Sequence, residues 1–455
     1  MEPWSSGLGR FVLLPCWAFF FVKLGVRHMP AKHSAARLAL LWGAILLSIR
    51  FVLAQNSPMD TRDASQTLTG RADSISDRRS FVSGNFPEEL SPLLAPNELT
   101  KWLLKTGIRG YGWIDGGFTY SSAGYGLLGP APTPNRFGQQ FLLNGVWLIT
   151  ELKPKPKPWS IGFRADFYAG SDAALLRPQN SFGPGSTHFG TDFRQAYVSL
   201  HTPGAGVRGI DWTIGRQNVP TGFETLMGPY RPMYSETYFW LKYEVGSTSA
   251  IATVHPTSKL DVLGGAVLGY NTVFELRGRA PSYIARAMYR PTGRKTTQIL
   301  ATAYTGPKPF AATAGHAGTW QTLGELQLRH TWSDRIYQVA QVHYAADVGD
   351  PAIGGRNAST QGAFVLTAYR WTKDLYAGLR TEWFDDPHGI RTGKPGSFGD
   401  ATLGLNYMPI RSLNFRPEIR GDFASQPSFT SAEQTTPRRN QLTVAFDLIW
   451  KFNGY

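Results

Sequence analysis

Short segments in which apolar and polar residues alternate fill the chain from Ile108 almost to its end. Successive side chains of a strand point to opposite faces, so each segment gains one apolar and one polar face. Each segment holds roughly ten residues, which is the length that a tilted strand needs to cross a bilayer. The pattern predicts sixteen strands, over 108–120, 140–152, 159–170, 192–201, 210–218, 246–256, 259–270, 283–291, 296–306, 321–332, 335–346, 362–371, 375–384, 399–408, 412–424 and 441–452.

One stretch shows what the polar face of such a strand carries. In NFRPEIRGDF, at 414–423, apolar residues alternate with Arg416, Glu418, Arg420 and Asp422. A surface strand of a soluble β-sandwich has its polar face in water. A strand of a transmembrane barrel has its apolar face in lipid and its polar face toward a water-filled lumen. A single segment is compatible with both folds, and the connections between the segments decide between them.

The connections alternate between long and short. Outer-membrane barrels have tight periplasmic turns and long outer loops, whereas a soluble sandwich has no reason to keep every second turn short. We therefore predict an all-β fold, a transmembrane antiparallel β-barrel of about 16 strands over residues 108–455. The expected long loops are 121–139, 171–191, 219–245, 271–282, 307–320, 347–361, 385–398 and 425–440. The expected short turns are 153–158, 202–209, 257–258, 291–295, 333–334, 372–374 and 409–411.

The last predicted strand supports the barrel. One face of QLTVAFDLIWKF, at 441–452, is unbroken and apolar, and it consists of Leu442, Val444, Phe446, Leu448, Trp450 and Phe452. Such a face suits contact with lipid, with Trp450 and Phe452 at the height of the headgroups. Asp447 and Lys451 lie on the opposite face, toward the lumen.

The first 54 residues predict an export signal. Two apolar runs, 11–22 and 38–47, are too short to span a bilayer comfortably. The second is followed by VLAQN, in which Val52 and Ala54 occupy the small-residue positions before a cleavage site. We expect a cleaved signal peptide over 1–54, either as one long targeting segment or as an ordinary one that starts at Met29. Its removal takes away six Lys or Arg and one Glu, so the net charge falls from +14 to +9.

Residues 55–107 join this signal to the barrel. Residues 55–95 are polar and rich in Ser, Asp, Arg and Pro, which predicts a linker without periodic structure. The segment ELTKWLLKT, at 98–106, predicts a short amphipathic helix that Asn97 caps and Gly107 ends.

Composition and motifs exclude several classes of protein. Beyond the N-terminus the chain has no run of about eighteen apolar residues, which excludes a helical membrane bundle. It has no recognisable nucleophile–base spacing, P-loop, dinucleotide fingerprint or metal-ligand spacing, so we expect no enzymatic activity, no cofactor and no metal. A basic chain can bind nucleic acid, but behind an export signal a basic lumen or contact with anionic lipid explains the charge better.

Several segments resemble the β-barrel porin-2 family of OmpL-like porins, and they occur in the family's order. The resemblance spans 108–452 and leaves residues 55–107 outside it. Its segments are GYGWIDGGFTYSS (110–122), RFGQQFLLNGVWLITEL (136–152), IGFRADFYAGSDA (161–173), RQAYVSLHTP (194–203), IGRQNVPTGFE (214–224), FRPEIRGDF (415–423) and FDLIWKF (446–452).

The resemblance implies a porin of the bacterial outer membrane, through which small hydrophilic solutes diffuse passively. Its partners would be outer-membrane lipid and, during biogenesis, the barrel-assembly machinery, but not nucleic acid. A homo-oligomer is one of the states that the sequence leaves open. One alternative function is a substrate-specific channel for sugars or organic anions, marked by an aromatic ladder or a basic track through the lumen. Another is a non-conducting structural or adhesive barrel, marked by loops long enough to form domains.

Two sets of residues are candidates for the pore. Because basic residues are in excess in the lumen, we expect mild anion selectivity. The longest connection, 219–245, follows the fifth strand, where porins place the loop that narrows the pore, and its six aromatic residues favour packing against the wall. In this loop we expect Glu224, Arg231 and Glu236 to face the pore. The alternation points twelve charged side chains of the wall into the lumen: Arg164, Asp166, Arg286, Arg290, Arg380, Glu382, Arg416, Glu418, Arg420, Asp422, Asp447 and Lys451.

Overall fold

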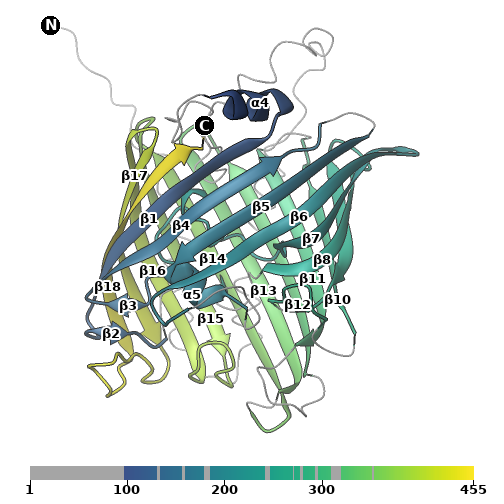
Figure 1. Ribbon diagram of the computed structural model, residues 1–455. Helices are drawn as coiled ribbons and strands as arrows, with labels where there is room; N and C mark the ends of the chain where they lie inside the picture. The colour runs from purple at the N-terminus through teal and green to yellow at the C-terminus, as the bar shows by residue number, and fades with distance from the viewer. Residues whose placement is uncertain are drawn as a thin grey trace, which may run out of the picture. The chain divides into compact units, whose positions relative to one another are not determined.

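Sixteen strands of the described chain form one closed antiparallel barrel in the computed structural model (Figure 1). The signal peptide expected over 1–54 and most of the linker expected over 55–107 lie outside the described residues. The structure describes residues 97–454 apart from 131–133, 156–158, 179–184, 241–245, 270, 277–279, 293–295, 309–318 and 351–352.

A short helix, α4 (Glu98–Thr106), precedes the barrel. It begins after Asn97, whose side-chain oxygen accepts a hydrogen bond from the Thr100 amide at 3.0 Å, while the Thr100 hydroxyl accepts one from the Asn97 amide at 2.8 Å. It ends at Gly107, whose φ of 84° lies in the left-handed region that glycine adopts most readily. No helix among the described residues is long and apolar enough to cross a membrane.

Each strand of the barrel pairs with its neighbours along the chain, and β18 closes the barrel against β1. Every strand overlaps one of the sixteen predicted from alternation, so the predicted fold class is confirmed. The strands are β1 (Arg109–Ser121), β4 (Gln140–Leu152), β5 (Ser160–Gly170), β6 (Gly190–Gly204), β7 (Val207–Asn218), β8 (Gly246–Val254), β9 (Leu260–Val267), β10 (Ser282–Tyr289), β11 (Thr297–Lys308), β12 (Thr319–Thr331), β13 (Ile336–Asp350), β14 (Arg356–Arg370), β15 (Leu375–Asp386), β16 (Gly396–Ile410), β17 (Leu413–Ala424) and β18 (Asn440–Asn453).

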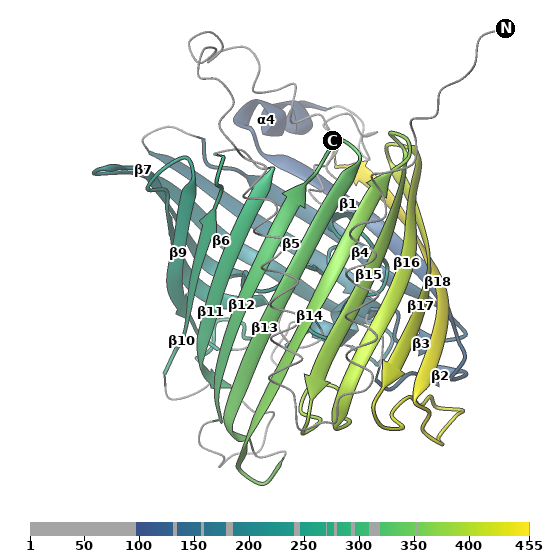
Figure 2. The same cartoon turned by 180° about the vertical axis from the view of Figure 1, so that it is seen from behind.

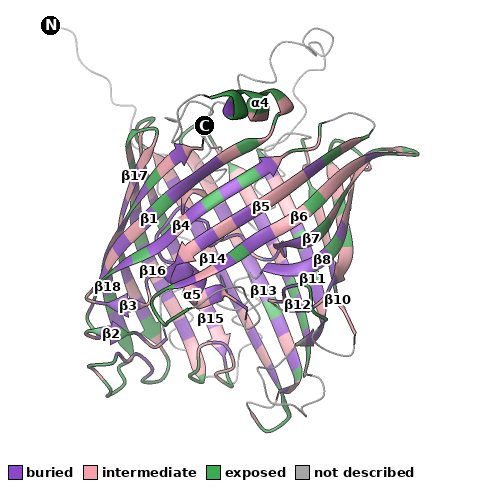
Figure 3. Cartoon of the chain, viewed as in Figure 1, coloured by how far each residue is buried: buried purple, intermediate pink, exposed green. Residues whose placement is uncertain are grey.

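Buried and exposed residues alternate along the strands (Figure 3). The exposed positions hold large apolar side chains, such as Phe141, Ile161 and Ile214. The largest fully buried side chains include the arginines Arg194, Arg216, Arg380, Arg416 and Arg420. A soluble protein buries apolar residues and exposes charged ones. The opposite distribution is that of a barrel with lipid outside and polar groups inside.

Short turns and long connections occupy opposite ends of the barrel (Figures 1 and 2). The C-terminus and α4 lie at the end of the short turns, as an even number of strands requires (Figure 2). The short turns are 153–159, 205–206, 255–259, 290–296, 332–335, 371–374 and 411–412.

The connection predicted at 347–361 is mostly strand, which corrects the sequence interpretation. β13 runs on to Asp350 and β14 begins at Arg356, so only 351–355 remain between them. The added strand ends, around Gly349 and Asn357, are largely polar. Alternation could not reveal them because they have no continuous apolar face.

Two other predicted loops contain regular structure. The loop at 171–191 opens with the helix α5 (Ser171–Leu176), and the loop at 121–139 contains the hairpin of β2 (Gly126–Leu127) and β3 (Phe137–Gly138). Next to this hairpin, the amide of Gly129 donates to the carbonyl of Thr430 at 2.9 Å, and the amide of Thr430 donates to the carbonyl of Gly129 at 2.8 Å. The first and the last outer connections are therefore joined across the closure of the barrel.

Candidate functional site: the inner loop of the barrel

The connection between β7 and β8 lies inside the barrel, and we call its described part, residues 219–240, the inner loop. None of its residues is exposed. Its apolar side chains join four clusters of buried residues on the wall. These clusters lie against β1, β4 and β5, against β8–β13, against β13 and β14, and against β15 and β16. The inner loop therefore contacts the wall around most of its circumference.

Charged residues of β17 hold the inner loop by its main chain. The Arg416 guanidinium donates to three main-chain carbonyls between Gly228 and Met233, at 2.8 to 3.3 Å. Two positions further on, the Glu418 carboxylate accepts hydrogen bonds from the amides of Tyr234 and Ser235, each at 3.0 Å. Hydrogen bonds to ionised groups are the stronger ones. The alternating charges of 414–423 therefore supply hydrogen bonds to the main-chain carbonyls and amides of the inner loop.

The returning part of the inner loop is held in the same way. Glu382 of β15 accepts hydrogen bonds from the amides of Tyr238, at 2.7 Å, and Phe239, at 3.2 Å. Arg420 of β17 donates to the carbonyl of Glu236 at 2.6 Å. Main-chain groups inside a barrel have no strand partner, so these side chains supply the hydrogen bonds that buried backbone requires.

The three charged residues predicted in this loop are buried, and they pair with the wall and with one another. Glu224 accepts hydrogen bonds from the Arg380 guanidinium and from the Thr237 amide, both at 2.7 Å. Arg231 forms an ion pair with Glu236 at 3.1 Å. These contacts fold the loop against itself and attach it to β15.

Apart from Lys451, the predicted wall residues of β15, β17 and β18 lie beneath the inner loop. Asp447 pairs with Arg416. Asp422 accepts hydrogen bonds from Arg420 at 2.8 Å and from the hydroxyl of Tyr238 at 2.7 Å. These side chains are buried. Alternation placed them on the inner face of the wall, where the structure finds them in contact with protein.

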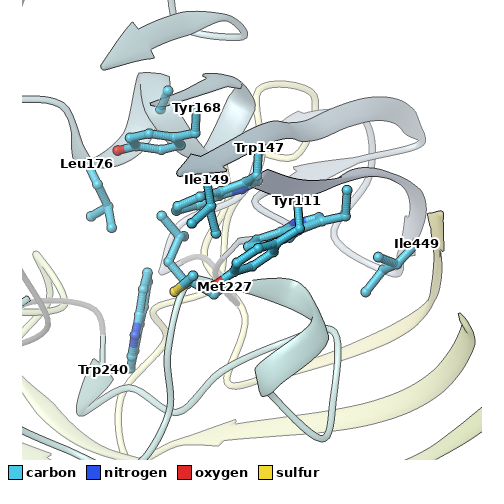
Figure 4. Close-up of a cluster of buried hydrophobic side chains, with 11 residues drawn as sticks. Tyr111, Trp147, Ile149, Tyr168, Leu176, Met227, Trp240 and Ile449 are labelled. Atoms are coloured by element: carbon cyan, nitrogen blue, oxygen red, sulfur yellow. The ribbon is translucent and has the colours of Figure 1, made fainter. Parts of the chain in front are cut away.

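A stack of aromatic side chains lines the inner wall of β1, β4 and β5. The ring centroids of Trp113 and Trp147 are 5.1 Å apart, and those of Trp147 and Tyr168 are 4.5 Å apart. Met227 and Trp240 of the inner loop pack against this stack together with α5 (Figure 4). The three rings are at most 1% exposed, so they form no open aromatic track of the kind expected in a sugar-specific channel.

Other predicted wall charges keep contact with solvent. Arg164 of β5 pairs with Asp166 at 2.7 Å, and the arginine side chain is 16% exposed against 0% for the aspartate. Arg286 of β10 lies 3.7 Å from Glu325, with exposures of 13% and 0%. In both pairs the arginine side chain is partly exposed and the carboxylate is buried. Lys451 of β18 is half-buried.

A chain of hydrogen bonds joins the short-turn ends of β6–β10. His255, in the turn after β8, lies 2.9 Å from Asp211 and 2.8 Å from Asp261. Asp261 also binds Arg290 at 2.6 Å, and Asp211 also binds His201. Ionised carboxylates only accept hydrogen bonds, so His255 donates to both of them when its imidazole is protonated. Partial burial disfavours this charge, but the hydrogen bonds and the negative charges of Asp261 and Asp211 raise the pKa of His255.

Sequence analysis missed two charged residues of β12 at this site. Glu325 accepts a hydrogen bond from the Gly222 amide at 2.7 Å, and the Arg329 guanidinium lies 5.1 Å from the ring centroid of Phe223. Glu325, Gln327 and Arg329 occupy every second position of β12, so they share its inner face. The alternation used for the other strands therefore predicts these two charged residues as well. In the part of the chain that the structure describes, no group of three or more His, Cys, Asp or Glu is arranged to hold a metal ion.

A closed sixteen-stranded barrel with an apolar outer face, charges inside and a long connection folded into its bore defines an outer-membrane channel of the porin class. The family described as "Putative beta-barrel porin-2, OmpL-like" matches residues 107–452. The chain belongs to this family, which confirms the resemblance found in the sequence.

Two solved structures share the fold. The outer membrane channel DcaP of Acinetobacter baumannii is 11% identical, with a TM-score of 0.52 over 76% of this chain and 97% of that one. The anion-selective porin from Comamonas acidovorans is 12% identical, with a TM-score of 0.53 over 76% of this chain and 99% of that one. At these identities the likeness shows the fold alone. No curated protein matches the sequence.

Proposed function

We propose that the protein lets small hydrophilic solutes diffuse passively across the outer membrane, with mild selectivity for anions and a constriction formed by the connection 219–245. The inner loop carries this proposal, because charged wall residues such as Arg416 and Glu418 hold it inside the bore. A barrel of sixteen strands is wide enough for an aqueous channel. The inner loop then sets the width of the path that remains.

Two partly exposed arginines support the preference for anions. In the pairs Arg164–Asp166 and Arg286–Glu325, the arginine side chain keeps some contact with solvent and the carboxylate is buried. Charged side chains that line a pore set its ionic preference. An anion that passes these positions meets guanidinium groups before it meets carboxylates.

We also propose that the chain reaches the outer membrane through the signal peptide expected over 1–54. The barrel-assembly machinery then inserts it, and lipid covers the exposed apolar residues of the outer face. Neither step depends on the oligomeric state.

Single-channel recording tests this function. The mature protein, beginning at Gln55, is refolded and inserted into a planar bilayer under a gradient of potassium chloride. We expect stable current steps and a reversal potential whose sign shows preference for chloride. A folded barrel that passes no current would refute the porin function and leave a structural barrel. Block of the current by one sugar or organic acid would favour a substrate-specific channel.

A further inference from the structure

Arg286, on β10, has a guanidinium that the protein only partly satisfies. Its Nε and Nη2 groups are buried and have no hydrogen-bond partner among the described residues. The carboxylate that faces it, Glu325, is 3.7 Å away and already accepts hydrogen bonds from the Gly222 amide at 2.7 Å and the Gln327 side chain at 2.8 Å. Arginine stays charged in proteins, and buried polar groups normally have partners. The buried side of this guanidinium therefore lacks an acceptor.

A second arginine is connected to the first through Glu325 and Gln327. Arg329 of β12 directs its Nε and Nη2 to the side-chain oxygen of Gln327, at 3.2 and 2.8 Å, so the group it binds there is neutral. The amide nitrogen of the same Gln327 side chain donates to Glu325, the carboxylate that faces Arg286. Both arginines keep part of their side chains open to solvent. Two positive charges thus share the neighbourhood of one carboxylate, that of Glu325.

A buried amide completes this group. Gln341 of β13 is the register partner of Gln327, and its side chain lies on the same inner face. It is 0% exposed, and neither its Nε2 nor its Oε1 has a hydrogen-bond partner among the described residues. An unsatisfied buried amide is unfavourable unless another molecule supplies the missing partners.

We propose that Arg286, Arg329 and Gln341 form a binding site for an oxyanion group, a carboxylate or a phosphate, on the solutes that pass through the lumen. The planar fork of a guanidinium matches two oxygens of such a group, and the local excess of positive charge attracts it. Gly222 and Phe223 of the inner loop border the site, so a solute meets it beside the constriction. The passage of the solute rests on the proposed porin function, whereas the binding does not.

The first test measures how inorganic phosphate and acetate, added separately, block the chloride current of the refolded mature protein. We expect Arg286→Gln and Arg329→Gln each to raise the half-blocking concentration about tenfold, the loss typical of one charged hydrogen bond. Arg290→Gln is the matched control because Arg290 has its own carboxylate, Asp261, at 2.6 Å. We expect this control to change the half-blocking concentration by less than about twofold, because Asp261 already neutralises the charge of Arg290. The stronger blocker identifies the oxyanion as phosphate or carboxylate.

A second test measures binding without conduction. Phosphate or acetate should raise the melting temperature of the refolded protein in detergent, and Arg286→Gln and Arg329→Gln should abolish the shift that Arg290→Gln retains. If Arg286→Gln does not fold, Arg286→Lys replaces it, since lysine keeps the positive charge but lacks the planar guanidinium. The shift of the melting temperature by phosphate or acetate should then be smaller than in the unmodified protein.

The outcomes separate the site from the channel. Equal effects of the three glutamine substitutions, or a conducting protein that neither anion blocks or stabilises, would overturn the site and leave the porin function intact. A folded protein that passes no current but keeps the phosphate or acetate shift would refute the porin function and support the site.

Discussion

Glu418 shows how a single residue of the wall fixes the backbone of a distant segment. Its carboxylate is buried and accepts hydrogen bonds from the amides of Tyr234 and Ser235, each at 3.0 Å. Without this acceptor the two amides would be buried and unsatisfied. A buried charge that is fully hydrogen-bonded is tolerated, whereas the loss of its partners is strongly destabilising.

We expect Glu418→Gln to loosen the inner loop. Glutamine keeps the size of the side chain but removes its charge and turns an N–H₂ group toward one of the two amides. The free energy of unfolding should fall by about 2 kcal/mol, the cost of losing hydrogen bonds to a charged group. Urea unfolding in detergent measures this loss, and bilayer recording should show more frequent current fluctuations.

Glu98→Gln is the control for this substitution, since Glu98 lies on α4 and its exposed side chain pairs with Lys101. We expect no change in either measurement for this variant. If the free energy of unfolding and the current of Glu418→Gln are also unchanged, other contacts hold the inner loop.

The strands of this barrel are more predictable than the route of its inner loop. Alternation is a local property, so it located all sixteen strands and the inner face of β17. The six aromatic residues of the inner loop, which lie between Phe223 and Trp240, correctly predicted a segment packed against the wall. Glu418 and Tyr234 are 184 residues apart in the sequence, so no local pattern predicts their contact. α5 was missed because six residues are too few to show helical periodicity.

Replacement of Thr221–Thr237 by a short Gly-Ser linker tests the role of the inner loop. We expect the single-channel conductance to rise at least about twofold, because a sixteen-stranded barrel without an inserted segment has a wide aqueous bore. Trp113 and Trp147 would lose the cover of Met227, so tryptophan fluorescence should shift to longer wavelength.

The segment 432–437 of the connection between β17 and β18 provides the control for the inner loop replacement, because it contains no buried residue and leaves Phe429, which packs with Tyr238 of the inner loop, in place. A Gly-Ser replacement there leaves the bore unchanged, and we expect the conductance to stay the same. Equal conductance after replacement of the inner loop would show that another part of the protein sets the width of the path.

In the barrel as a whole, the charged residues of the wall have two different tasks. Most of those of β15, β17 and β18, such as Arg380 and Asp422, are buried beneath the inner loop and hold it in place. Others, such as Arg164 of β5 and Arg286 of β10, keep contact with solvent. The net charge of the chain therefore says little about the charge of the lumen, because only the second group is open to solvent. Alternation assigns both groups to the inner face and cannot separate them, since the separation depends on where the inner loop lies.

The histidine chain makes the charge at the short-turn end of the barrel depend on pH. His255 lies between Asp211 of β7 and Asp261 of β9, and His201 and Arg290 extend the chain to β6 and to the turn after β10. The pKa of His255 is raised, so the stabilisation that its protonated form provides is fully present below the ordinary histidine value of about 6.5. This stabilisation is lost as pH rises through the raised pKa. The positive charge is then lost, and because a neutral imidazole has a single N–H group, only one of the two hydrogen bonds to Asp211 and Asp261 remains.

We therefore expect the anion preference and the thermal stability to decline as pH rises from the ordinary histidine value of about 6.5 through the raised pKa of His255. Reversal potentials and melting temperatures across this range measure the two effects. His255→Gln should abolish the dependence, because glutamine stays neutral at every pH. His188→Gln, in an exposed outer connection, should keep it. An unchanged pH profile in His255→Gln would assign the titration to another group and leave the chain from His201 to Arg290 a purely structural link.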